Sequence, residues 1–298
     1  MGSTEPPERG AGKLLAVVVN WNGGADTPRA LGSLEGIETI CVDNGSTDGS
    51  DADVERRFPA VELLRTGENL GFAGGSNVGI RRALERGADW VLLLNNDAVA
   101  GDGLADALAG AAVARPDAGL LACTIYAGLD GDTLQYAGAS FNALLGYSGR
   151  VSTKPADVRL REVGRADGAA MAISRPAVEA AGVLDETLFA YVEDVELSLR
   201  VRAAGFAVVL VPDARVWHRG SASTGGTAST ANLYYDTRNT IVVCERHRPL
   251  PRGLTALRRG IAVGAHLVQA ARHPRRGEAA RAVLQGRRDA RRGRLGRR

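Results

Sequence analysis

Amide and carboxylate side chains follow directly after three apolar segments of this 298-residue chain. They are Asn20 and Asn22 after residues 14–19, Asp43 after residues 37–42, and Asn95, Asn96 and Asp97 after residues 90–94. Carboxylate oxygens are the ligands that hard divalent cations prefer, and amides form hydrogen bonds with other polar groups. Gathered at one place, these residue types would suit a ligand that carries both phosphate and a polar base.

A glycine-rich segment, NLGFAGGSN at residues 69–77, adds further polar groups to this set. Its candidate site residues are Asn69, Gly71 and Asn77. Glycine allows close approach of the backbone to a ligand, and the N-terminus of a helix directs free N–H groups outward. We therefore expect a nucleotide at this place, with an acid for its base and a metal ion for its pyrophosphate.

Alternating strands and helices must position these residues. Apolar strands that alternate with amphipathic helices are typical of a mostly parallel sheet covered on both faces. Ligands of such sheets bind at the carboxyl ends of the strands, where the polar residues lie. The expected strands are 14–19, 37–42, 61–64 and 90–94, and the expected helices are 27–34, 51–58, 73–86 and 104–114.

The second half of the chain is less regular. Residues 128–166 are rich in Gly, Ser and charge, and we expect long loops there. The expected strands are 120–125, 169–173 and 207–211, and the expected helices are 176–181, 192–204, 230–246, 254–272 and 278–290.

Composition indicates a globular protein of a reducing compartment. The longest apolar runs fall far short of the ~18 residues of a transmembrane helix, and the polar N-terminus has no signal-peptide core. Three cysteines without CxxC spacing indicate free thiols. We therefore expect a cytoplasmic protein, peripheral at the inner face of the plasma membrane if its basic C-terminal segment binds lipid.

That segment, residues 251–298, carries fourteen arginines and two acids, a balance of +12, whereas the other 250 residues balance −9. A basic segment attracts anionic surfaces. It could be a solvated helical face or an anchor on an anionic membrane surface. Nucleic acid is not expected as a partner, because no aromatic residues are interleaved with the arginines.

Several motifs, in this order along the chain, resemble the inverting glycosyltransferases of family GT2, which have the GT-A fold. The motifs are VVVNWNG (17–23), CVDNGSTDGS (41–50), NLGFAGGSNVGI (69–80), LLLNNDA (92–98), GVLDETLFAYVEDVELSLRVRAAGF (182–206), VWHRGSAS (216–223) and YYDTRNTI (234–241). Among relatives, the Asn-Asn-Asp form looks most like rhamnosyltransferases.

The resemblance implies a role for each matching residue. Asp43 resembles the acid that binds the imide of uracil or thymine. Asp97 resembles the last acid of the DxD motif, which holds Mg²⁺ or Mn²⁺, although Asn95 replaces the first acid. Asp194 resembles the general base, and His218 a histidine that completes the metal shell in some relatives. Two further matches, Glu193 and Arg238, are implied to lie near the substrate.

Transfer of a sugar to a hydroxyl needs positive charge at the departing diphosphate and a base on the opposite side of the sugar. One candidate base and no second nucleophile predict inversion at the anomeric carbon. The expected donor is a dTDP- or UDP-sugar, and the acceptor is a glycan, a lipid-linked glycan or a small molecule. Two alternatives stay open: a nucleotidyltransferase that makes a sugar nucleotide, and a non-catalytic module that binds nucleotide or glycan.

The expected organisation is an α/β GT-A domain with a mostly parallel central sheet and a basic helical tail. Residues 1–12 form a disordered N-terminus and residues 13–248 the GT-A domain. The nucleotide half covers 13–125 and the acceptor half 126–248. Residues 249–298 form the Arg-rich helical tail.

Overall fold

The computed structural model describes residues 12–129, 131–150, 159–220 and 229–298. The N-terminus expected to be disordered lies, except for Gly12, outside the described residues. So does the end of the motif at 216–223, from residue 221 onward.

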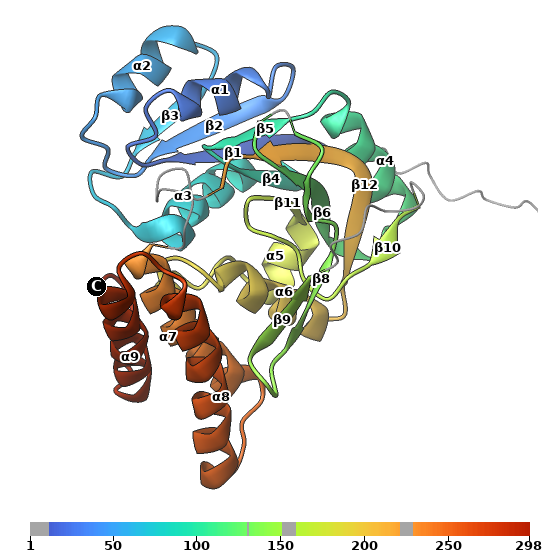
Figure 1. Cartoon of the computed structure of the whole chain (residues 1–298). Coiled ribbons are helices and arrows are strands. Elements are labelled where there is room, and N and C mark those ends of the chain that lie inside the picture. The colour runs from blue at the N-terminus through green and yellow to red at the C-terminus, as the bar shows by residue number, and fades with distance from the viewer. Residues whose placement is uncertain (1–11, 130, 151–158, 221–228) are drawn as a thin grey trace, which may run out of the picture.

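The first half of the chain forms alternating strands and helices, as the sequence predicts. Strands β3, β2, β1 and β4 are neighbours in that order, and all of them run parallel. Figure 1 shows α1 and α2 on one face of this sheet and α3 on the other. The elements are β1 (Leu14–Asn20), α1 (Asp26–Gly32), β2 (Glu38–Asp43), α2 (Ser50–Arg57), β3 (Glu62–Arg65), α3 (Gly71–Glu85), β4 (Trp90–Asn95) and α4 (Leu104–Ala114).

The second half extends the same sheet beyond β4. Strand β11 lies between β4 and β6 and runs antiparallel to both, and β12 pairs with β6 in parallel. A short strand, β5, pairs antiparallel with the end of β12. The mostly parallel sheet expected from the sequence is confirmed. The added elements are β5 (Ala98–Ala100), β6 (Ala118–Ala127), β11 (Ala170–Ser174), α5 (Arg175–Ala181), η1 (Glu186–Leu188), α6 (Glu193–Ala203) and β12 (Ala207–His218).

The expectation of long loops across residues 128–166 is wrong for much of the described part. Strands β8 and β9 form a hairpin, β7 pairs with β6, and β10 pairs with β12. These strands are short and carry polar or small residues, so periodicity alone does not reveal them. They are β7 (Leu134–Tyr136), β8 (Ala139–Asn142), β9 (Tyr147–Arg150) and β10 (Arg161–Glu162).

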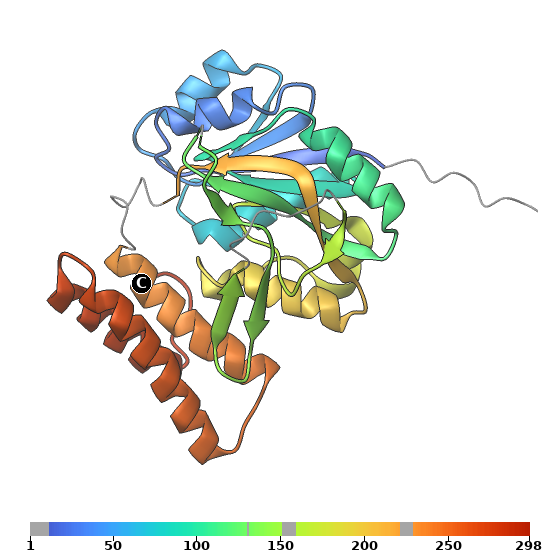
Figure 2. The ribbon, with the colours of Figure 1, turned by 45° about the vertical axis from the view of Figure 1, so that its right-hand side comes forward.

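Three C-terminal helices form a bundle beside the sheet (Figures 1 and 2). They are α7 (Thr230–His247), α8 (Arg252–Ala271) and α9 (Arg276–Arg291). Apolar side chains of all three share a small core that includes Leu233, Ile241, Val263, Ala279 and Val283. The Arg-rich segment is therefore helical, and both of its helices pack with α7.

Candidate functional site

The tip of β4 brings Asp97 next to His218 through the pairing of two strands. After Asn95 and Asn96 the chain turns into β5, and its first residue, Ala98, pairs with His218 at the end of β12. The Arg219 N–H also donates to the Asp97 carbonyl over 3.0 Å. As a result His218 Nε2 lies 3.1 Å from Asp97 Oδ1. The structure thus brings together the two residues predicted to bind metal.

His218 is held in one orientation by its other ring nitrogen. Gln135 Nε2 lies 3.2 Å from His218 Nδ1, which leaves Nε2 facing Asp97. Burial acts to lower the pKa of His218, but the hydrogen bond and the charge of Asp97 outweigh it, so the pKa is raised above its usual value. In metal-binding histidines a hydrogen bond likewise orients the ring through the nitrogen that does not bind the metal.

These residues fit a divalent cation that also binds a diphosphate. The donor set combines a carboxylate with an imidazole, and Asn95 Oδ1 is buried without a hydrogen-bond partner. Within the residues that the structure describes, no group of three or more His, Cys, Asp or Glu side chains could hold a metal. Mg²⁺ and Mn²⁺ sites often use one or two protein ligands and fill the remaining positions with phosphate oxygens and water. Asp97 and His218 would be those ligands.

The tips of β1 and β2 are joined by one buried amide. Asn20 is fully buried, and its Nδ2 donates to Asp43 Oδ1 over 2.9 Å and to Ser50 Oγ over 2.9 Å. Asn20 Oδ1 accepts from the Thr27 hydroxyl over 2.6 Å. The Ser46 N–H approaches Asp43 Oδ2 over 3.2 Å. Asn20 therefore fixes the carboxylate of Asp43, and this network comes from residues close to the two strand ends.

The other amides of this edge also fix its loops. Asn22, at φ 51°, accepts from the Thr47 N–H over 2.7 Å through its Oδ1. Asn69 Oδ1 accepts from the Gly71 N–H over 2.8 Å. Asn96 Nδ2 donates to the Thr27 hydroxyl over 3.2 Å. Hydrogen bonds within this edge therefore hold its loops in place, and the predicted substrate-binding residues belong to these loops.

Glycine is required at position 71 because the two halves of the molecule approach each other closely there. It has φ 78°, and a Cβ at this position would lie 2.3 Å from the Phe189 carbonyl oxygen. That same oxygen accepts from the Ala73 N–H over 3.1 Å. The start of α3 therefore contacts the loop at residues 189–192, which leads into α6.

Asp194, the predicted base, stands in the first turn of α6. Its Oδ2 accepts from the Gly168 N–H over 2.9 Å and lies 3.3 Å from Arg165 Nη1. Burial is the largest influence and raises the pKa of Asp194, while the Arg165 charge opposes that shift. Its side chain keeps 15% of its surface exposed. A carboxylate that is partly exposed and has a raised pKa is suited to accept a proton.

Glu193 precedes Asp194 and is more buried. Its Oε2 has no hydrogen-bond partner within the described part of the chain. Burial and the neighbouring charge of Asp194 raise the pKa of Glu193 to about 8. Burial therefore favours its protonated form, which can donate as well as accept a hydrogen bond.

Asp167 is a further site residue that the sequence analysis missed. It lies in the segment 165–169, which reaches the tip of β4 because β11 runs antiparallel to β4; the Asn95 N–H donates to the Ala169 carbonyl over 2.9 Å. The charge of Asp167 acts on both His218 and Asp194. It therefore lies near both of these residues, and its side chain is only 14% exposed. The signal that could have found it is an acid just before an apolar strand.

The loop before Asp194 is held in an unusual backbone conformation. Phe189, Tyr191 and Val192 have φ values of 67°, 67° and 71°. Such values are uncommon outside glycine and least favourable for a β-branched residue such as Val192. Asn239 Nδ2 lies 2.7–2.9 Å from the carbonyls of Leu188, Ala190 and Tyr191. Contacts from α7 therefore stabilise the loop that presents Asp194.

Two residues predicted to bind substrate lie inside the protein. Asn77 is fully buried, and its amide bonds to the Leu184 backbone through both of its atoms. Arg238 is 1% exposed, and its guanidinium donates to the carbonyls of Leu188 and Gly296. Both connect elements that carry the site, and their direct contact with substrate stays a prediction.

Sequence comparison identifies similar proteins over most of the chain. A family model described as "Glycosyltransferase like family 2" matches residues 35–239. An N-acetylglucosaminyl-diphospho-decaprenol L-rhamnosyltransferase of Mycobacterium tuberculosis is 31% identical over 286 residues, which cover 86% of this chain and 92% of that protein.

Solved structures share the fold at low sequence identity. GalNAc-T7 with UDP, GalNAc and Mn²⁺ has a TM-score of 0.61 at 16% identity, covering 84% of this chain and 54% of that one. The mannosyltransferase PcManGT from Pyrobaculum calidifontis, in complex with GDP-Man and Mn²⁺, has a TM-score of 0.56 at 15% identity, covering 95% and 76%. This chain spans about half the length of GalNAc-T7.

Proposed function

The chain belongs to glycosyltransferase family 2, and we propose that it moves a sugar from a dTDP- or UDP-sugar to an acceptor hydroxyl with inversion at the anomeric carbon. Membership in a family of glycosyltransferases leaves no support for the two alternatives, a nucleotidyltransferase and a non-catalytic binding module. The single observation that carries the proposal is the pairing of Asp97 with His218 at 3.1 Å on the same edge as Asp43.

Donor binding is proposed for the tips of β1, β2 and β4. Asp43 would accept a hydrogen bond from the imide of uracil or thymine, with its carboxylate fixed by Asn20. Asp97 and His218 would hold Mg²⁺ or Mn²⁺ against the diphosphate. When bound, the cation supplies positive charge that stabilises the departing diphosphate. The mannosyltransferase and GalNAc-T7 structures with Mn²⁺ support this part of the proposal.

Acceptor activation is proposed for Asp194. The acceptor oxygen attacks the anomeric carbon, the bond from that carbon to the diphosphate oxygen breaks, and the electron pair leaves with the diphosphate. The hydroxyl proton passes to the carboxylate of Asp194, whose orientation is fixed by the Gly168 N–H. Arg165 stabilises the ionised form of Asp194 before the reaction. One displacement of this kind inverts the configuration.

Rhamnose is the proposed sugar, and a lipid-linked glycan is the proposed acceptor. The support is the mycobacterial relative, whose name specifies transfer of L-rhamnose to N-acetylglucosaminyl-diphospho-decaprenol. No helix within the described ranges is long and apolar enough to cross a membrane. We therefore propose that the protein reaches such an acceptor from the cytoplasmic side, bound peripherally to the inner face of the plasma membrane.

A donor screen tests this function. The purified chain is melted with dTDP-rhamnose, UDP-sugars and GDP-sugars, each with and without Mn²⁺. A ligand that binds only the folded state raises the melting temperature by mass action. We expect a shift with a dTDP- or UDP-sugar that requires Mn²⁺, and product NMR should show an inverted anomeric configuration. A shift with GDP-sugars alone, or a retained configuration, would contradict the proposal.

A further inference from the structure

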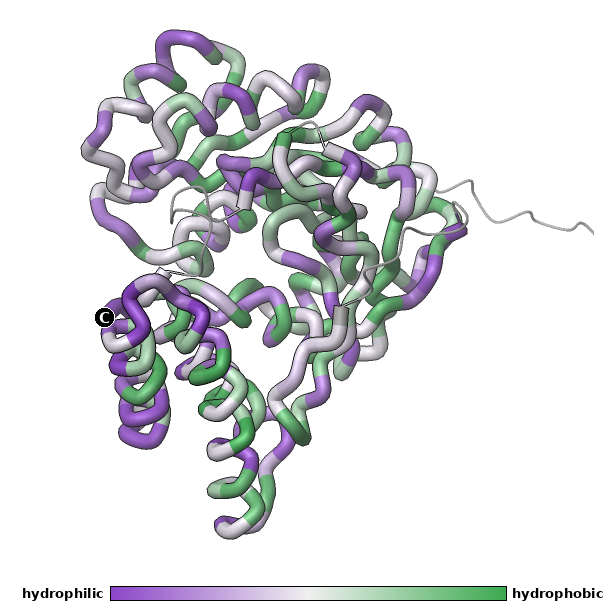
Figure 3. The backbone as a smooth tube through the Cα atoms, in the orientation of Figure 1, coloured by the Kyte–Doolittle hydropathy of each residue, from purple (hydrophilic) through white to green (hydrophobic). Residues whose placement is uncertain are grey.

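Large apolar side chains lie exposed on the β8–β9 hairpin and on α8 of the Arg-rich tail. Leu144 and Leu145, in the turn between β8 and β9, are each 46% exposed, and Tyr147, the first residue of β9, is 65% exposed. On α8, four more side chains are 46–60% exposed: Leu254, Leu257, Ile261 and Val268. Figure 3 shows apolar residues on both elements. Together these seven residues are called the apolar ledge below.

The two parts of the ledge are neighbours in space although more than a hundred residues separate them. Arg258 Nη1 lies 3.3 Å from the Ala143 carbonyl in the hairpin turn and donates to the Arg248 carbonyl over 2.6 Å. A Cβ placed on Gly146 would lie 3.3 Å from Cys244 Sγ and 3.7 Å from Ala262. Figures 1 and 2 both show the hairpin turn beside the first turns of α8. The hairpin turn therefore packs against α8, which places the two parts of the ledge close together.

Helix α8 has apolar residues on two faces, and only one of them is used by the fold. Ala262, Val263 and Ala270 turn inward and join the core of the bundle. Leu257, Ile261 and Val268 follow the same helical spacing on the outward face, where they stay exposed. The outward stripe is not needed to bury the bundle core, so its apolar character calls for another partner.

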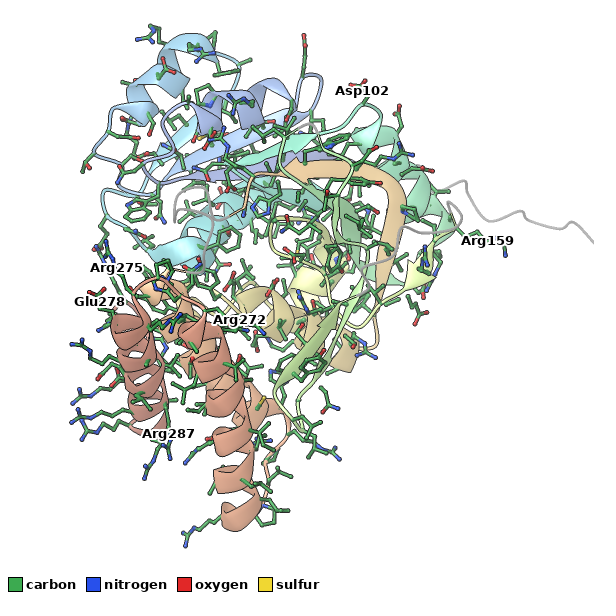
Figure 4. The ribbon with its side chains drawn as sticks, in the orientation of Figure 1. Asp102, Arg159, Arg272, Arg275, Glu278 and Arg287 are labelled. Carbon is green, nitrogen blue, oxygen red and sulfur yellow. The ribbon has the colours of Figure 1, made fainter. Side chains whose placement is uncertain are left out.

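Positive charge lies at the C-terminal end of this stripe and on the neighbouring helix α9. Arg272, directly after the last residue of α8, falls on the same side as Leu254 by helical spacing, whereas Arg252, the first residue of α8, falls on the opposite side. Figure 4 shows Arg272 and Arg275 at the turn into α9 and Arg287 on α9 itself. Arg252, Arg272 and Arg287 form no ion pair with any residue that the structure describes. The ledge is thus apolar, with cationic side chains at the C-terminal end of α8 and on the neighbouring helix α9.

We propose that the apolar ledge is a docking surface for an anionic phospholipid bilayer. Leucine, isoleucine and tyrosine side chains would enter the boundary between headgroups and acyl chains, and the arginines would contact lipid phosphates. A helix with an apolar outer stripe and basic residues nearby has the pattern of interfacial membrane helices. The proposal deepens the proposed function, since it rests on a lipid-linked acceptor and names the surface by which the enzyme reaches it.

A second copy of the chain is a poorer occupant of the same surface. Two copies that meet at the ledge would bring together two segments that each carry a balance of +12, and like charges repel. A nucleic acid would match the arginines, but it would leave the apolar ledge without a partner. An anionic bilayer matches both the charge and the apolar ledge.

Vesicle binding of the full chain tests the ledge. Sedimentation with phosphatidylcholine vesicles is compared with vesicles that contain 30% phosphatidylglycerol, at low and high salt. We expect binding that requires phosphatidylglycerol and weakens with salt. Changing Leu257→Ser with Ile261→Ser, or Leu145→Ser with Tyr147→Ser, should lower the partition coefficient at least about tenfold, since each pair removes two side chains that would enter the bilayer.

A matched control uses an exposed apolar residue elsewhere. Val113 on α4 is 55% exposed, and Val113→Ser should leave vesicle binding unchanged. Melting curves confirm that each variant folds, and transfer to a short water-soluble acceptor should equal that of the wild type. Ledge variants that bind vesicles as well as the wild type would overturn the proposal. So would light scattering that shows a dimer for the wild type and a monomer for the ledge variants. Absence of transfer in the wild type, with lipid binding intact, would count against the proposed function alone.

Discussion

The donor edge, formed by the tips of β1, β2 and β4, and the base region, formed by Asp194 and the loop before it, are held in place in different ways. At the donor edge, Asn20 and Asp43 stand at the ends of neighbouring strands and are linked to each other and to the loops that follow. Asp194 instead depends on partners from separate elements: Gly168 before β11 and the loop at 189–192, which Asn239 of α7 stabilises. The donor edge is thus a local construction, and the base region is assembled from distant parts of the chain.

This difference predicts how each region responds to substitution. A change at the donor edge should act on ligand binding at the site itself. A change on α7, far along the chain from Asp194, should act on turnover, because it alters the loop that positions the base.

Removing the base should abolish most of the activity. Asp194→Asn keeps the shape of the side chain but cannot accept the proton, so kcat should fall by about 10²–10⁴-fold. Donor affinity, measured by calorimetry, should stay within about twofold, because the donor edge is built separately. Asp106→Asn, at another first-turn acid on α4, is the matched control and should be fully active. A fully active Asp194→Asn variant would remove Asp194 from the mechanism.

Changing α7 should lower turnover without removing a reacting group. Asn239→Ala leaves the carbonyls of Leu188, Ala190 and Tyr191 without their shared donor, and the loop with positive φ should relax. Displacement of a catalytic group by about 1 Å can lower the rate by about 10²-fold, so kcat should fall about 10- to 100-fold. The donor Kd should not change.

Thr237 supplies the control for this experiment, because its hydroxyl donates within α7, to the Leu233 carbonyl. Thr237→Ala should leave kcat close to the wild-type value. Equal losses of kcat in the two variants would mean that α7 acts through general stability rather than by positioning Asp194.

Glu193 offers a smaller effect, on stability and its dependence on pH. Burial and the charge of Asp194 raise its pKa to about 8 in the folded protein, whereas an unfolded glutamate has a pKa of about 4.3. Folding therefore binds a proton, and the stability of the wild type falls as pH rises toward 8. Glu193→Gln has no such dependence, so its stability relative to the wild type should increase from pH 6 to 8 and then level off. Melting temperatures that differ by the same amount at every pH would contradict this.

The two regions also differ in how well the sequence alone predicts them. The polar residues at the donor edge directly follow apolar strands, and the ends of parallel strands meet at one edge by a general rule. Local pattern was therefore enough to place Asp43 and Asp97. The role of His218 could be predicted only from the family resemblance, because its approach to Asp97 depends on the pairing of β5 with β12.

The base region could not be predicted in the same way. Asp167 reaches the site only because β11 runs antiparallel to β4, and periodicity does not give strand direction. The burial of Arg238 and Asn77 follows from contacts with residues more than forty positions away. Their polar side chains suggest a ligand when seen alone, yet they form hydrogen bonds to backbone groups and to the side chains of Glu186 and Asn239.

The proposed sugar transfer depends on a divalent cation held between Asp97 and a nucleotide diphosphate. Calorimetric titration of the preferred nucleotide into wild-type protein and the Asp97→Asn variant, each with and without Mn²⁺, tests this directly. We expect Mn²⁺ to tighten binding by at least about tenfold in the wild type and to have no effect in the variant, with equal metal-free affinities. Binding that depends on Mn²⁺ to the same degree in both proteins would contradict the account.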